Sequence, residues 1–319
     1  MQGRALHDRG RPYSGIETVA SKPWLRTFIR DNARAVASLM TLLPMIAEVP
    51  FRAAAMGALL ALLAAGSVMV WYGLLQRWWS HQPLLEPEPG SRARWYSPAS
   101  LGAVYLALLF TCMSLLPRIS GGAATEASSP TLDSILTFAG IAVAIVVVLP
   151  SVLVRSGPSG RELGLTTERL TDQVRVGIKG YLAAVVPMAV SMAATLPFRG
   201  VENQHSLLKL LKTSPGLGTV LAIVVSAVVA APLLEELLYR VILQGWLTSF
   251  LPAVIAIPVV AIVFCLVHGW RDGLALLPLA FILGYVFHRR HSYISVVVIH
   301  ALFNATNLTL QLLSPDAQS

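Results

Sequence analysis

The chain has 319 residues, of which 55% are hydrophobic and only 13% are charged, and it carries a formal net charge of +8 at pH 7. With a mean hydropathy of +0.67, it is too apolar and too poor in charge for an ordinary soluble domain. The basic excess lies mostly on arginines that flank apolar runs, and no basic stretch in a soluble domain is interleaved with stacking aromatics. We therefore expect a lipid bilayer, and no nucleic acid, as the surface that this protein meets.

Long apolar runs recur along the chain, most of them close to the roughly 20 residues that cross a bilayer core. They lie at about 54–75, 98–117, 134–154, 176–197, 217–247, 251–268, 273–287 and 292–313. We predict an all-α, polytopic transmembrane helix bundle with about eight spans. A ninth stretch, 36–51, is interrupted by Pro44 and Glu48 and would be a short span, a re-entrant piece or an interfacial helix. A soluble bundle is the alternative, but its outer helices would need polar stripes that these runs lack.

The distribution of lysine and arginine bears on the orientation. If 36–51 crosses the bilayer, the N-terminus shares one side with the loops near 76–97, 155–179 and 288–291 and with Arg240, and 18 of the 24 basic residues lie on that side. If it does not cross, the two sides are nearly balanced. The positive-inside rule favours the first arrangement, with a cytoplasmic N-terminus in a bacterial-type inner or plasma membrane.

Three parts are expected along the chain. Residues 1–35 form a basic cytoplasmic extension, 36–200 form the N-terminal transmembrane helices, and 217–313 form a transmembrane domain that holds every candidate for chemistry. The most polar internal segment is 155–175, which contains a GPSG sequence around Ser159. That sequence resembles a rhomboid nucleophile motif, but it lies in a polar loop, so we interpret it as a turn.

Two adjacent carboxylates, Glu235 and Glu236, lie inside the apolar run 217–247. Ionisable groups at bilayer depth are costly, and they persist mainly where they form pairs or act in function. Glu236 and Arg240 are four residues apart on one helical face, so they can neutralise each other, or both glutamates could share Arg240 in a structural network. Pro232 lacks an N–H, which leaves the Val228 carbonyl without its α-helical partner and favours a kink just before the acids.

Three more polar side chains lie in later apolar runs. His268 ends one run and could be an ordinary interfacial histidine, while His300 and Asn304 lie one turn apart in the last run and could join helices by hydrogen bonds. Counting from the turn near Ser249, however, Glu235 lies ~21 Å and His268 ~26 Å along their helices. Similar depths favour one shared polar pocket. There a carboxylate could act as general base for water, and imidazoles could position that water or bind a divalent metal.

The sequences EELLYR at 235–240, FCLVH at 264–268 and HALFN at 300–304 resemble the EExxxR, FxxxH and HxxxN motifs of the CPBP intramembrane peptidases. This family includes the type II CAAX prenyl endopeptidases and the Abi proteins. The resemblance covers about residues 217–310, and its three motifs occur in order at separations compatible with spans. Two positions depart from the family pattern: Val241 follows the motif arginine, and His288-Arg-Arg-His291 replaces the usual turn. Neither departure affects the four polar residues.

The resemblance implies that Glu235 activates water and that His268, His300 and Asn304 position water, oxyanion or metal, whereas Glu236 and Arg240 are supporting residues. Glu235, His268 and His300 would suffice for a zinc site with an open position, although Asn304 would be an unusual ligand. No organic cofactor is expected, and no HExxH motif occurs.

We therefore expect a membrane endopeptidase, in the metal-dependent interpretation a metalloprotease, that hydrolyses a membrane-associated protein or peptide. The alternatives are a non-catalytic scaffold or immunity protein and a proton-coupled transporter that uses the same buried residues.

Overall fold

The computed structural model describes the backbone of residues 23–90, 92–119, 131–198, 210 and 216–314, and most side chains of these ranges from Phe51 onward. The chain divides into two compact units, residues 1–54 and 55–319. Most of the extension expected at 1–35 lies outside the described residues. The stretch 36–51 is helical, but none of its side chains before Phe51 is described, so its relation to the bilayer and the three-part division of the chain stay predictions.

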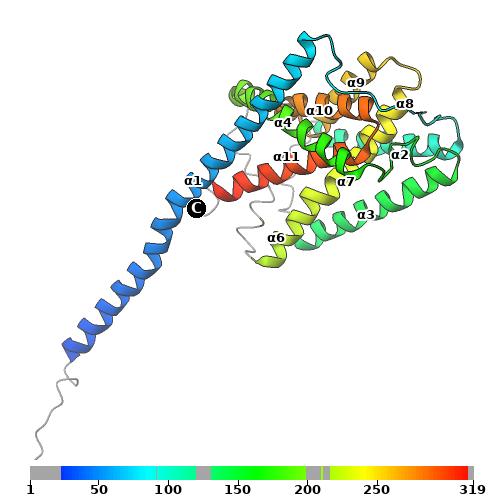
Figure 1. Cartoon of the computed structure of the whole chain (residues 1–319). Helices are drawn as coiled ribbons and strands as arrows, with labels where there is room; N and C mark the ends of the chain where they lie inside the picture. Colours follow the sequence, from blue (N-terminus) through cyan, green and yellow to red (C-terminus); the bar gives the residue numbers. More distant parts are fainter. Residues whose placement is uncertain (1–22, 91, 120–130, 199–209, 211–215, 315–319) are drawn as a thin grey trace, which may run out of the picture. The chain divides into compact units, whose positions relative to one another are not determined.

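Every regular element in the described ranges is helical (Figure 1). The long helices are α1 (Pro23–Trp79), α2 (Pro98–Ile119), α3 (Leu132–Arg155), α4 (Leu170–Thr195), α9 (Ala253–Val267), α10 (Trp270–Arg290) and α11 (Tyr293–Leu313). A short 3₁₀ turn, η2 (Leu196–Phe198), follows α4. One further rod consists of α6 (Leu217–Val224), η3 (Val225–Ala230), α7 (Ala231–Glu236), η4 (Leu237–Gln244) and α8 (Gly245–Leu247), in which η3 and η4 are π-helical.

Six described helical segments are long and apolar enough to cross a membrane, and α9 is a shorter apolar helix. The six are Phe51–Trp79, Pro98–Leu116, Leu132–Arg155, Leu170–Thr195, Leu217–Leu247 and Tyr293–Leu313. Each of the eight apolar runs recognised in the sequence overlaps a helix or the rod over most of its length. The prediction of an all-α, multi-pass membrane protein is confirmed.

The outer helices expose apolar side chains. Leu62 and Met69 on α1, Tyr105 and Met113 on α2 and Val147 on α3 are each more than half exposed. A water-soluble bundle would bury such side chains or replace them with polar ones, whereas lipid tails solvate them. The soluble alternative therefore does not fit the surface of this protein.

The rod 217–247 is the most buried of the candidate spans. All eight residues of η4 are buried, and the rod packs against α2, α3, α9, α10 and α11. Helix α4 packs along both α10 and α11. The rod's polar residues thus face other helices rather than lipid.

Three basic loops meet at one end of the bundle. The Glu88 N–H donates to the Arg289 carbonyl at 2.8 Å, and the Ala93 N–H donates to the Glu162 carbonyl at 2.9 Å. These bonds join the loops after α1, α3 and α10, as expected for loops on one side of a membrane. Arg240 does not belong to this group, because it is fully buried in η4. It therefore adds nothing to the charge count of that side.

Two glycines let α4 approach α11 closely. A Cβ at Gly177 would lie 2.7 Å from the Val298 Cβ, and one at Gly180 would lie 2.6 Å from the Ile299 Cδ1. Small residues at crossings of spanning helices permit such close backbone approach. Because α11 carries His300, this contact also fixes the depth of the candidate site.

We predict that Gly177→Ala and Gly180→Ala each lower the stability of the bundle by ~1–3 kcal/mol through overpacking. Thermal unfolding of the purified chain in detergent measures the effect. Gly140→Ala on α3 is the matched control, because nothing lies within 4 Å of a Cβ there. Equal melting temperatures for all three variants would contradict this close packing.

Candidate active site

The rod is irregular on both sides of its two glutamates. In η3 the Ala231 N–H donates to the Ser226 carbonyl, five residues back instead of four. In that register the carbonyl that Pro232 leaves without a donor belongs to Ala227. The expectation that Val228 loses its partner is wrong, because it assumed an α-helical register throughout.

The Asn304 side chain supplies the hydrogen-bond donor that Pro232 lacks. Its Nδ2 donates to the Ala227 carbonyl at 2.7 Å, so the side-chain amide of α11 takes the place of a missing backbone N–H of η3. Unpaired backbone carbonyls inside a bilayer are costly, and this bond removes one. Asn304 thus joins two helices directly beside the site, as the sequence alternative of an interhelical hydrogen bond allowed.

Glu236 lies at the centre of a buried network. Its Oε1 accepts from His300 Nδ1 at 2.8 Å, and its Oε2 accepts from Arg240 Nε at 3.1 Å. The side chains of Glu236 and Arg240 are 0% exposed and that of His300 is 5% exposed. The guanidinium carbon of Arg240 lies 5.1 Å from the centre of the Phe264 ring, where cation–π attraction adds to the pairing.

Glu235 points to a different set of groups. Its Oε2 lies 3.6 Å from His268 Nε2 and 4.0 Å from His300 Nε2. This oxygen is buried, and it has no hydrogen-bond partner within the described part of the chain. The Glu235 side chain is 19% exposed and that of His268 is 31% exposed, so the accessible side of the site is here.

The length of α9 sets the depth of His268. At 15 residues this helix is ~22 Å long, which is less than the ~30 Å core of a bilayer. His268 follows its last residue, and Gly269, with φ +92°, turns the chain into α10. His268 lies beside Glu235, with its Nε2 3.6 Å from Glu235 Oε2, so the two side chains share one depth, as the sequence predicts for a shared polar pocket.

Hydrogen bonds fix which ring nitrogens carry protons. His268 Nδ1 lies 2.7 Å from the Phe264 carbonyl, which can only accept, so this nitrogen carries the proton. The Glu236 carboxylate, paired with Arg240, likewise accepts from Nδ1 of His300. In neutral rings both Nε2 atoms then present lone pairs to Glu235. Three acceptor atoms converge on one point.

Such a donor set has the chemistry of a metal site, since histidines that bind metals through Nε2 usually donate Nδ1–H to a carbonyl or carboxylate. Yet no group of three His, Cys, Asp or Glu side chains in the described ranges is arranged to hold a metal ion. The zinc expected for Glu235, His268 and His300 stays a prediction.

Sequence reasoning named the six charged or polar residues that the structure brings together: Glu235, Glu236, Arg240, His268, His300 and Asn304. It missed Gln244, whose Nε2 donates to the Gly284 carbonyl of α10, and Tyr293, whose hydroxyl donates to the Leu233 carbonyl of the rod. Gln244 could have been found by its spacing, because it lies one turn after Arg240. Ser159, the rhomboid-like serine, lies in an exposed turn, where it bonds to Glu162.

The fold and the site define a multi-pass membrane protein with a carboxylate–imidazole centre among its helices. Residues 217–306 match the model of a family described as type II CAAX prenyl endopeptidase Rce1-like. This match confirms the resemblance seen in the three motifs, over less than a third of the chain. No curated protein and no solved structure matches the chain.

A double-mutant cycle tests the bond of Asn304. We predict that Asn304→Ala lowers stability by ~1–3 kcal/mol, because the Ala227 carbonyl loses its donor. In a Pro232→Ala background the restored N–H can reach that carbonyl, so the cost of Asn304→Ala should fall by at least half. Thermal unfolding of the four proteins gives the coupling. If Asn304→Ala lowers stability equally in the parent and in the Pro232→Ala background, the Asn304 amide does not replace a missing backbone N–H.

Proposed function

We propose that the protein is an intramembrane endopeptidase that hydrolyses a peptide bond of a membrane-associated protein or peptide, with Glu235 as the base that activates water. The observation that supports this most strongly is the position of Glu235 Oε2, within 4.0 Å of both Nε2 atoms. The family match and the partial exposure of Glu235 and His268 point to the same activity.

The site has more hydrogen-bond acceptors than one water molecule can satisfy. A water molecule has two O–H donors, so it can satisfy only two of the three converging acceptors. The third acceptor needs a further donor or a cation. One imidazolium or one metal ion beside the water would satisfy it, and either could stabilise the oxyanion of a tetrahedral intermediate.

In the proton-only form of the reaction, Glu235 takes a proton from water while the oxygen attacks the scissile carbonyl. The bond from carbon to the carbonyl oxygen becomes single, and the protonated ring of His268 or His300 donates to that oxygen. Glu235 then gives its proton to the leaving amine as the carbon–nitrogen bond breaks. Glu236 and Arg240 touch no reacting atom in this scheme; they orient His300.

A divalent metal, if bound, would be held by His268, His300 and Glu235, and it would acidify a bound water and polarise the substrate carbonyl. Asn304 would not be a ligand, because its Nδ2 is engaged with the Ala227 carbonyl. The substrate would reach the site from within the membrane, and the basic loops would face the cytoplasm.

Removal of the base should abolish catalysis without unfolding the protein. We predict that Glu235→Gln and His300→Ala each lower kcat/KM by at least ~10²-fold, the usual contribution of a general acid or base. Suitable probes are a synthetic peptide that ends in a prenylated Cys-a-a-X sequence and the same peptide without the prenyl group. Mass spectrometry of the purified full chain in detergent detects the products.

Asp133→Asn is the matched control, since this acidic residue is exposed in the first turn of α3, and the substitution should leave activity unchanged. If the parent cleaves a probe and both site variants cleave it equally well, the proposal is wrong. Loss of proton-coupled flux in those two variants would then support the transporter.

Chelation separates the two forms of the mechanism. For the metal-dependent form, which we favour, dialysis against a chelator should lower kcat by at least ~10²-fold, and added Zn²⁺ should restore it. His268→Ala should also abolish zinc retention as measured by elemental analysis. If the protein keeps full activity after dialysis and contains no zinc, the metal-dependent form is wrong, and an imidazolium would stabilise the oxyanion.

A further inference from the structure

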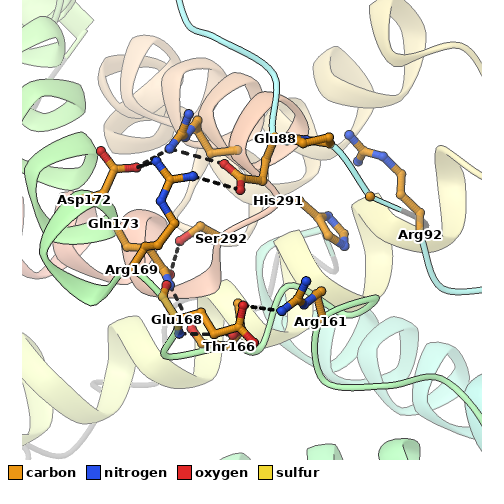
Figure 2. A pocket seen from close by; sticks show the side chains of 13 residues that line it. Glu88, Arg92, Arg161, Thr166, Glu168, Arg169, Asp172, Gln173, His291 and Ser292 are labelled. Atoms are coloured by element: carbon orange, nitrogen blue, oxygen red, sulfur yellow. Dashed lines mark hydrogen bonds and ion pairs between the residues drawn. The ribbon is translucent and has the colours of Figure 1, made fainter.

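A second polar hollow lies where the three basic loops meet (Figure 2). It is lined by residues of the loops after α1, α3 and α10 and of the first turn of α4. The sequence marked two of these segments, the polar stretch 155–175 and the unusual His288-Arg-Arg-His291 turn. Neither is used by the candidate active site.

The carboxylates of this hollow already have basic partners. Glu88 and Asp172 both pair with Arg169 and with Arg290. Glu168 pairs with Arg161, and the Arg161 guanidinium holds the pKa of that carboxyl below its usual value. The acidic side of the hollow is therefore neutralised, and it offers no charge to the remaining basic groups.

One arginine of the hollow, Arg92, lacks such a partner. Arg92 donates to the backbone carbonyl of His288 and has no carboxylate partner among the described residues. Although Arg92 as a whole is exposed, partial burial of its guanidinium lowers its pKa. Four arginines thus line the hollow, and of these only Arg92 has no carboxylate partner in the described structure.

His291 lies between these arginines in the view of Figure 2. Its Nε2 donates to the Glu162 carbonyl at 2.8 Å, whereas its buried Nδ1 has no hydrogen-bond partner in the described structure. Burial and the nearby charges of Arg92 and His288 lower the pKa of His291. An anion in the hollow would relieve this repulsion and would give Nδ1 a partner once it is protonated.

The place of the hollow indicates the source of the anion. Arg290 ends α10, and Tyr293 begins α11, which is one of the six candidate spans. The turn between them therefore lies at the end of a candidate span, where lipid headgroups are expected. Basic pockets between spanning helices on the cytoplasmic side commonly bind lipid phosphates. Guanidiniums also match phosphate oxygens in geometry.

We propose that this hollow binds the phosphate group of an anionic phospholipid, held by Arg92, Arg161 and the ring of His291. The lipid stabilises the junction of the three loops. Its binding is independent of the peptidase reaction, because none of these residues belongs to the centre around Glu235.

The test uses the full chain in a neutral detergent, with thermal unfolding followed by tryptophan fluorescence. We add phosphatidylglycerol, phosphatidylcholine at equal acyl composition, or inorganic phosphate. Phosphatidylglycerol should raise the melting temperature by a few degrees and phosphatidylcholine should not. Arg92→Gln and Arg161→Gln should each increase the lipid concentration for half-maximal effect by at least about fivefold, as expected for the loss of one charge-assisted contact.

Arg94→Gln is the matched control, because Arg94 is an exposed basic residue in the same loop that does not line the hollow. Arg94→Gln should respond as the parent does, which excludes a general effect of net charge. If Arg92→Gln fails to fold, Arg92→Lys, which keeps the charge, and Arg161→Gln carry the test. A parent-like response of Arg161→Gln, or an equal effect of both lipids, would overturn the site. If inorganic phosphate raises the melting temperature as much as phosphatidylglycerol does, and the same variants lose this effect, the hollow binds free phosphate and not a lipid.

Discussion

The Glu236 carboxylate is the constraint on which the rest of the site depends. Its two oxygens hold His300 from α11 and Arg240 from the same rod, and all three side chains are almost completely buried. A buried charge that loses one partner typically costs 3–5 kcal/mol, so neither contact is easily given up. Because His300 Nδ1 must donate to Glu236, its Nε2 must face Glu235. Glu236 thus determines which nitrogen of His300 faces Glu235.

The two adjacent glutamates of α7, which lies between two π-helical segments, meet different neighbours. Widened turns shift the backbone register, and the unpaired carbonyl moves with it to the position where Asn304 can reach it. Irregular helix of this kind often occurs at functional sites. Here it is stabilised by a side chain from α11, so the same helix that supplies His300 also holds the rod in place. The packing of α4 against α11 through Gly177 and Gly180 fixes the depth of both residues.

Much of the fold and most of the site could be predicted from the sequence, because ionisable residues in apolar runs are rare and their four-residue spacings assign faces. The hydrophobic periodicity could not reveal the π-helical register, because a shift of one residue in the backbone hydrogen bonds leaves the composition of the segment unchanged. For this reason the carbonyl without a backbone donor was expected at Val228 and not at Ala227. Gln244 and Tyr293 were missed because their partners are backbone carbonyls of distant segments. The hollow at the three loops was missed because it depends on loop conformation, and the sequences of loops show no hydrophobic periodicity from which a conformation could be predicted.

The central claim is that His268 and His300 both carry protons on Nδ1 and turn Nε2 toward Glu235. Nitrogen-15 NMR of the histidine-labelled full chain in lipid nanodiscs at pH 8 tests it most directly, with His268→Gln and His300→Gln spectra to assign the signals. The account predicts Nδ1–H on both rings and a lone pair or a bound cation at Nε2 of at least one of them. A neutral ring with its only proton on Nε2, at either position, would contradict it.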